Sequence, residues 1–160
     1  MKTNDGAYIF GTPHFTLAEF TRSAKAQALS LDNTPTAAAK ANLARTAQML
    51  ERVRAHLGAP ITITSGYRGA ALNKAVGGVT SSDHLQGLAA DVVVPKYGTP
   101  YEVAKALAPH IDALGIGQVI YEVSGSSRWV HLSARVPEKT VNRVITIAVG
   151  QGTMLGIQRV

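Results

Sequence analysis

The stretch Ser82-Asp83-His84-Leu85-Gln86-Gly87-Leu88-Ala89-Ala90-Asp91 decides how this sequence is interpreted, together with Trp129-Val130-His131 further along the chain. His84 and Asp91, with Gly87 between them, do not have the spacing of two residues on one helical face. They require a loop that folds back onto the start of the next strand. Two imidazoles and one carboxylate, with a fourth position left to water, are typical of a catalytic rather than a structural zinc site.

Each part of this pattern also has a simpler explanation. An unrelated histidine and aspartate at the spacing of His84 and Asp91 occur in many proteins. His131 lies in a predicted strand whose alternation places Trp129, His131 and Ser133 on one face. Taken alone, it is compatible with a buried histidine whose hydrogen bonds are satisfied within the core.

Glu122 adds an independent argument, because it lies in the strand predicted before the one that carries His131. If the turn between these strands has two or four residues, Val123 pairs with Arg128 and Glu122 faces Trp129. Glu122 and His131 are then diagonal neighbours on one face, roughly 7–8 Å apart. A carboxylate there could act as a general base towards water on a metal. A three-residue turn would break this parity and remove the argument. The alternative interpretation of Glu122 is a glutamate at the rim of a hairpin.

Arg68 ends the loop Ser65-Gly66-Tyr67-Arg68, which follows a short predicted strand. An arginine at such a position could grip a carboxylate or stabilise an oxyanion, and the alternative is a solvated loop arginine. Asp83, next to His84, is interpreted as a loop residue or as support for the ligands. The other histidines occur in helical or cap contexts and are predicted to be structural or exposed: His14, His56 and His110.

Composition and charge limit the possible functions. The 160 residues include no cysteine, which excludes disulfides and thiolate ligands, and 46% are apolar, as in a globular domain. The formal net charge of +6 favours anionic partners, but the basic residues are scattered and only 6% are aromatic, so no nucleic-acid partner is expected. No signal peptide and no membrane-inserted segment is predicted. One monomeric domain over residues 1–160 is expected, with residues 1–13 as an extended arm.

The periodicity and the capping signals predict an α+β fold, with a small, mostly antiparallel sheet and helices packed against it. Thr16 with Glu19, and Thr99 with Glu102, have the pattern of capping boxes, and Phe15 with Phe20 that of a hydrophobic staple. Helices are predicted over residues 16 to about 27 or 29, 36–57, 70–75 and 100–114, the last disturbed at Pro109. Strands are predicted over residues 61–64, 89–94, 117–123, 128–134 and 143–149, with one more in the last ten residues.

These motifs, taken in order, resemble the family of zinc D-Ala-D-Ala carboxypeptidases and phage endolysin metallopeptidases, whose fold the hedgehog signalling domain shares. The resemblance is closest to the small single-domain peptidoglycan peptidases and covers most of the chain. It rests on residues 14–20, 31–33, 50–54, 63–68, 73, 76–78, 82–91 and 129–133.

The resemblance implies that His84, Asp91 and His131 are zinc ligands and that Arg68 holds a substrate carboxylate or polarises the scissile carbonyl. Ser82 and Trp129, within the same motifs, are expected to contact the substrate. The chain departs from several members at Arg128, where they place an acidic or histidine base three residues before the last histidine ligand. Glu122 is therefore the candidate general base.

The function implied is a zinc-dependent peptidase that hydrolyses a peptide bond in bacterial peptidoglycan stem peptides or crosslinks, as a phage-type endolysin does. It would stay in the host cytoplasm until its release to the cell wall, or belong to a phage virion. The departure at Arg128 motivates an alternative, a non-catalytic zinc-stabilised module for wall binding or virion assembly. The sequence leaves open which bond is cut and whether the enzyme is an endopeptidase or a carboxypeptidase.

Overall fold

A computed structural model describes residues 8, 9 and 11–160 of the chain. Its helices are α1 (Leu17–Thr21), α2 (Ala24–Ala28), α3 (Ala37–Leu57), α4 (Ala70–Ala75) and α5 (Pro100–Leu107), with 3-10 turns η1 (Asp83–Gln86), η2 (Ala108–His110) and η3 (Thr140–Arg143). Its strands are β1 (Thr62–Ser65), β2 (Ala89–Val93), β3 (Gln118–Ser124), β4 (Ser127–Ser133), β5 (Val144–Ala148) and β6 (Gly152–Leu155). The predicted α+β class is confirmed.

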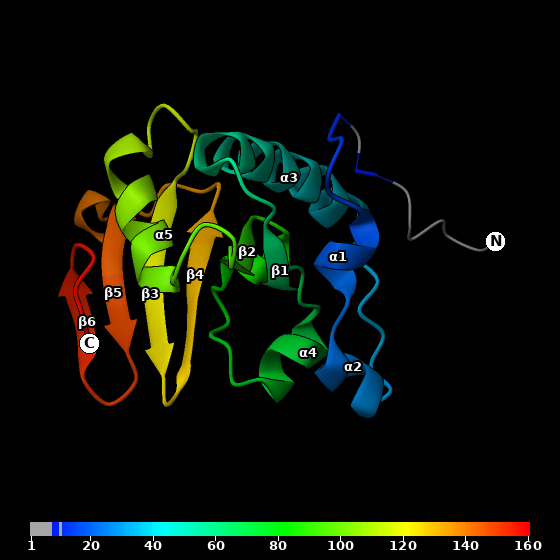
Figure 1. Ribbon diagram of the computed structural model, residues 1–160. Helices are drawn as coiled ribbons and strands as arrows, with labels where there is room; N and C mark the ends of the chain where they lie inside the picture. The colour runs from blue at the N-terminus through cyan, green and yellow to red at the C-terminus, as the bar shows by residue number, and fades with distance from the viewer. Residues whose placement is uncertain (1–7, 10) are drawn as a thin grey trace.

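The strands form one six-stranded sheet in the order β1-β2-β4-β3-β5-β6 (Figure 1). The prediction of a mostly antiparallel sheet is confirmed, with one exception, since β5 runs parallel to β3. The chain leaves β4, passes through η3 and returns to the start of β3, so that Val144 pairs with Val119. Because β4 already ends beside the start of β3, this segment begins β5 at that same end of the sheet, and β5 runs parallel to β3. The other neighbouring pairs are antiparallel.

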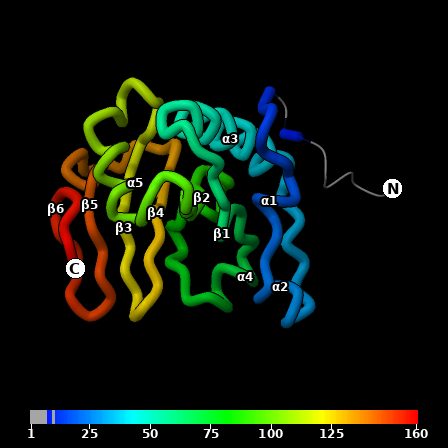
Figure 2. Tube along the Cα trace, in the orientation of Figure 1, coloured from blue at the N-terminus to red at the C-terminus, as the bar shows by residue number. Residues whose placement is uncertain are grey.

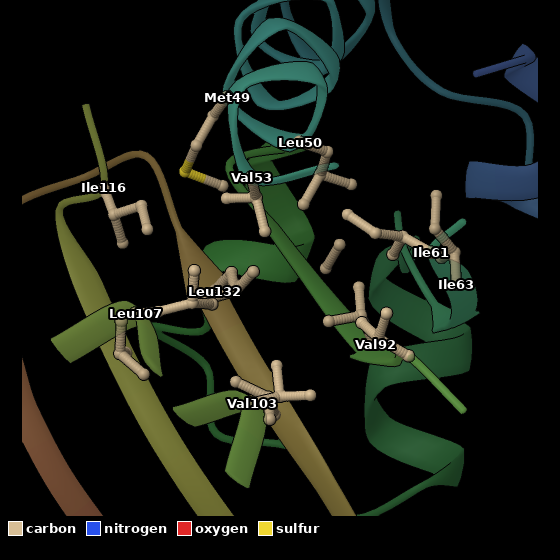
Figure 3. Packing of buried hydrophobic residues seen from close by; sticks show 14 of the residues in the cluster. Met49, Leu50, Val53, Ile61, Ile63, Val92, Val103, Leu107, Ile116 and Leu132 are labelled. Atoms are coloured by element: carbon tan, nitrogen blue, oxygen red, sulfur yellow. The ribbon is translucent and has the colours of Figure 1, made fainter. Parts of the chain in front are cut away.

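One face of the sheet carries the hydrophobic core, and α3 and α5 cover it. Figure 3 shows Met49, Leu50 and Val53 of α3 pointing towards Val92 and Leu132 of the sheet. Side chains alternate along a strand, so the neighbours of these core residues point to the opposite face. That second face therefore presents the polar side chains of β2, β3 and β4, which include Asp91, Glu122 and His131.

The predicted first helix is divided into α1 and α2 and does not run through to residue 27 or 29. Its start is as expected: the capping box of Thr16 and Glu19 is formed, and the Phe15 and Phe20 ring centroids lie 6.3 Å apart. The break has a tertiary cause. The Tyr67 amide donates to the Phe20 carbonyl at 2.6 Å and Asn33 Nδ2 donates to the Thr21 carbonyl at 2.9 Å, so these carbonyls do not continue the helix.

The predicted helix over residues 100–114 is shorter than expected. Its capping box, Thr99 with Glu102, is present, but α5 ends at Leu107 and the 3-10 turn η2 replaces the next turn. Pro109 lies in that turn, where it lacks the amide hydrogen that a continuing α-helix requires. The predicted disturbance at Pro109 is therefore confirmed, and the predicted end at residue 114 is wrong.

The predicted extended arm over residues 1–13 falls mostly outside the described residues. Within the described part, Tyr8 forms an isolated antiparallel bridge with Thr16, and the Ile9 amide donates to the Phe15 carbonyl at 2.9 Å. The C-terminal strand β6 lies at the other edge of the sheet from β1 (Figure 2). None of the helices in the described residues has the length and apolarity of a membrane span.

Candidate metal centre

Three predicted ligands meet on the polar face of the sheet. Asp91 of β2 and His131 of β4 are direct partners in the antiparallel register, and His84 approaches from η1. Asp91 Oδ1 lies 3.2 Å from His84 Nε2 and 3.0 Å from His131 Nδ1. One ligand atom from each residue lies within 4.8 Å of the others, which makes this a group that could hold a metal ion.

The loop that carries His84 is fixed by a hydrogen bond of the His84 ring and by close packing of Gly87 against α3. His84 Nδ1 donates to the Gly66 carbonyl at 2.6 Å, which leaves Nε2 directed at Asp91. Gly87 ends η1 with a φ of 74°, and a Cβ there would lie 2.6 Å from the Ala39 carbonyl oxygen of α3. Only glycine fits this close approach without strain. The glycine between His84 and Asp91 thus allows the loop to fold back onto β2, as the spacing predicts.

The chemistry of the donors fits a zinc ion. Burial alone would raise the pKa of Asp91, but the charge and hydrogen bonds of the two imidazoles outweigh it and hold the pKa well below the ordinary value. The carboxylate therefore stays ionised and available to a cation. Two ring nitrogens and one carboxylate oxygen match the ligands of catalytic zinc sites, which keep a further position open.

A cleft of about 540 Å³, called here the metal-site cleft, opens over this group. Its walls come from the loop after α4, from β2, and from the β3–β4 hairpin with β5 beside it. The structure brings every predicted site residue to this one cleft: Arg68, Ser82, His84, Asp91, Glu122, Trp129 and His131. Their spatial grouping is thus established, while their individual chemical roles remain predictions.

Glu122 reaches the cleft by the predicted route. Ser124 pairs with Ser127, so the turn consists of two residues, and Glu122 faces Trp129 while Ile120 faces His131. Burial and the charge of Asp91 raise the pKa of the Glu122 carboxyl, against the opposing effects of His131 and Arg68. A carboxyl with a raised pKa next to a metal group is suited to taking up and returning a proton.

Arg68 and Ser82 lie together at the cleft wall. Arg68 Nη2 donates to Ser82 Oγ at 3.3 Å, and the Arg68 amide donates to the His84 carbonyl at 3.1 Å. Arg68 Nε and Trp129 Nε1 are buried and have no hydrogen-bond partner among the described residues. Buried donors are normally paired, so these two are exceptions within the residues that line the cleft.

Two features of the site were not predicted. Asp83, expected only as a loop or supporting residue, accepts hydrogen bonds from Ser133 Oγ at 2.7 Å and from Arg135 Nε at 2.5 Å. A second cavity of about 640 Å³ adjoins the metal-site cleft and shares Arg68, Val76 and Asp91 with it. Neither follows from local sequence pattern, because each joins segments that are distant along the chain.

The remaining histidines lie elsewhere, as predicted. His14 Nδ1 lies 2.7 Å from Glu51 Oε2 near the start of α1. The rings of His56 and His110 pack against each other with centroids 4.6 Å apart. None of these three lines the metal-site cleft.

The resemblance of the sequence is confirmed at the level of the family. A family model described as Peptidase M15 matches residues 13–133, which include the three candidate ligands and Glu122. No curated protein matches the chain. Since the match covers most of the chain and the site it spans has the donors of a zinc centre, the chain belongs to the peptidase M15 family of zinc-dependent metallopeptidases.

Proposed function

We propose that this chain is a zinc-dependent peptidase that hydrolyses a peptide bond in bacterial peptidoglycan stem peptides or crosslinks, as a phage endolysin does. The observation that carries the proposal is the arrangement of one cleft. A carboxyl group with a raised pKa, Glu122, and a guanidinium, Arg68, line the same cavity as the three-residue metal group. A base, a cation for the substrate and a metal group together are the requirements of metal-assisted peptide hydrolysis.

The proposed roles follow the geometry. His84 Nε2, an Asp91 carboxylate oxygen and His131 Nδ1 would hold the zinc ion. When bound, zinc supplies Lewis acidity, which lowers the pKa of water and polarises a carbonyl. The Glu122 carboxylate takes a proton from the attacking water and then gives it to the nitrogen of the leaving amine.

Arg68, Ser82 and Trp129 position the substrate. Burial lowers the pKa of the Arg68 guanidinium, against the charges of Asp91 and Glu122, but an arginine stays protonated in proteins. Its charge is suited to a substrate carboxylate or to the developing oxyanion. Ser82 orients this guanidinium, and Trp129 lines the same cleft, where it contacts the substrate.

The two adjoining cavities favour an endopeptidase over a carboxypeptidase. They meet at Arg68 and Asp91, so peptide could extend on both sides of the metal group. The second cavity also carries the basic side chains of Arg22 and Lys25, and the net charge of +6 favours an anionic wall polymer. We propose a monomer that is released from the host cytoplasm to the wall, or carried in a virion.

Digestion of purified peptidoglycan tests the proposal. Zinc-loaded protein should create new amino and carboxyl termini, identified by mass spectrometry, and the positions of these termini name the bond. The His84→Ala variant should bind little zinc and release no fragments, while His56→Ala, outside the cleft, should act like the unmodified chain. Full zinc occupancy without new termini would overturn the proposed peptidase activity and would favour a zinc-stabilised binding or assembly module.

A further inference from the structure

Arg135 lies just beyond β4, at the rim of the metal-site cleft, and no motif of the sequence draws attention to it. Its side chain is 44% exposed, and its Nε donates to Asp83 Oδ1 at 2.5 Å. It lies outside residues 13–133, the part of the chain that the family model matches. The match with the family model therefore carries no information about Arg135.

A buried network orients this guanidinium. The Asp83 side chain is only 6% exposed, and its other oxygen, Oδ2, accepts from Ser133 Oγ at 2.7 Å. Ser133 Oγ in turn accepts from the Arg135 amide at 3.1 Å. Both the backbone and the side chain of Arg135 are thus tied to the same pair of residues. An arginine fixed in this way loses less conformational entropy when it binds a ligand than a freely moving one.

The two terminal nitrogens of the Arg135 guanidinium are available to bind a ligand. Among the described residues, Asp83 is the hydrogen-bond partner of Nε, and neither Nη1 nor Nη2 has a partner. These two nitrogens form a fork suited to both oxygens of a carboxylate. The Arg128 guanidinium differs, since it lies at the exposed hairpin turn, donates to the Gly125 carbonyl and does not line the cleft.

The charge balance of the cleft also favours an anionic ligand. Its lining holds three carboxylates, Asp83, Asp91 and Glu122, and two guanidinium groups, Arg68 and Arg135. A divalent cation on the metal group changes the sum from one negative charge to one positive charge. A substrate with a free carboxylate would then be attracted into the cleft, and the fork of Arg135 would hold that carboxylate at the rim.

We propose that Arg135 is a specificity-determining residue, which binds a free carboxylate of the peptide substrate and selects it against the same peptide with that group amidated. The inference rests on the proposed function, because it takes a peptide as the occupant of the cleft. Free α-carboxylates of D-glutamate and the second carboxyl of diaminopimelate are the groups of this chemistry in a peptidoglycan stem. Asp83 and Ser133 act through Arg135 and are positioning residues.

Matched pairs of synthetic stem peptides, carboxylate and carboxamide, test this assignment by steady-state kinetics. The unmodified chain should prefer the carboxylate through a lower KM. Arg135→Ala should lose about ten- to a hundredfold in kcat/KM on the carboxylate peptide, the typical effect of one charge-assisted hydrogen bond, with little change on the carboxamide. Arg135→Lys should restore part of the preference, and Arg128→Ala should leave both substrates unaffected.

The outcomes separate this inference from the proposed function. An equal loss on both peptides, or a loss in kcat alone, would show that Arg135 only braces the fold and would overturn the inference. If no peptide is cleaved, binding of the two peptides to zinc-loaded chain by calorimetry decides. Discrimination that disappears in Arg135→Ala supports the carboxylate site even when the proposed function fails, and equal binding of both peptides rejects it.

Discussion

Glu122 and His131 lie on the same face of the β3–β4 hairpin. Glu122 pairs with Trp129, and the side chains of Trp129 and His131, two residues apart in β4, point to the same face. A two-residue turn, Gly125-Ser126, fixes this parity, and Gly125 adopts a φ of 59° within it. Turns of this kind match the twist of the strands that they join. The relationship between the candidate base and a candidate ligand is thus built into the backbone of the hairpin.

Replacing Glu122 with glutamine should abolish most of the activity while zinc binding persists. The amide keeps the size of the side chain but cannot take up a proton, and general acid–base catalysis typically contributes about 10²- to 10⁴-fold to the rate. The measurement is kcat on a cleavable peptide, with zinc content determined for the same preparation. Glu138→Gln is the matched control, since Glu138 is exposed and outside the cleft. Near-normal kcat in Glu122→Gln would reject Glu122 as the base.

Zinc should raise the melting temperature of the chain. A ligand that binds only the folded state stabilises it by about 2.7 kcal/mol when its free concentration is about a hundred times Kd. For a chain of this size that corresponds to a rise of about 5 to 10 °C in Tm. Scanning calorimetry of the metal-free and zinc-loaded protein measures the shift. It should vanish in His131→Ala and persist in His56→Ala, whose ring packs on His110 away from the cleft.

The parts of the site that could be predicted are those governed by local rules. Strand alternation and turn length determine which residues share a face, so the placement of Glu122 beside Trp129 follows from a short stretch of sequence. Capping residues mark where helices begin, and Thr16 and Thr99 both cap as expected. The assignment of His84, however, also required the family resemblance, because the position of a loop over a strand has no periodicity.

The parts that could not be predicted depend on contacts between distant segments. The break between α1 and α2 depends on hydrogen bonds from Asn33 and Tyr67, and the sequence around Thr21 contains no signal that predicts these bonds. The parallel pairing of β5 with β3 depends on the path of the connection after β4. The ion pair of Asp83 and Arg135 joins two loops, and no pattern of residue types links them. Tertiary structure overrides or supplements local propensity at each of these places.

Zinc affinity should fall as the pH falls, because protons compete for His131. Burial lowers the pKa of His131, but the hydrogen bond and the charge of Asp91 outweigh it, so the pKa lies above the ordinary value of about 6.5. Below the raised pKa the metal-free imidazole is protonated and must lose its proton to bind zinc. The affinity should then drop about tenfold per pH unit, while Asp91, with its lowered pKa, stays ionised.

The raised pKa of His131 also makes the stability of the metal-free protein depend on pH. A raised histidine pKa contributes stability that is fully present below about pH 6.5 and is lost as the pH rises through the folded value. Competition with a chelator across this range measures the zinc affinity, and denaturant unfolding of the metal-free chain measures the stability. A zinc affinity that is independent of pH would contradict the protonation of His131.

Gly66 links the packing of α1 to the orientation of His84, so Gly66→Ala should impair both stability and metal binding. A Cβ at this position would meet the Phe20 carbonyl oxygen and lie 2.7 Å from the Phe20 Cα, which are backbone atoms and cannot simply rotate away. Overpacking of this kind typically costs about 1–3 kcal/mol of stability. The Gly66 carbonyl that accepts from His84 Nδ1 must shift with it, and loss of such an outer-shell partner typically lowers metal affinity about 10- to 100-fold.

Gly69→Ala is the control for this experiment, because the two glycines belong to one loop. The nearest atom to a Cβ at Gly69 is Asn33 Oδ1 at 3.5 Å, an ordinary van der Waals contact, and its φ of −61° suits any residue. Urea unfolding and zinc competition should therefore distinguish the two variants. If Gly66→Ala loses stability but binds zinc normally, the Gly66 carbonyl does not orient His84, and the ring must be held by its packing against His131, whose centroid lies 5.1 Å away.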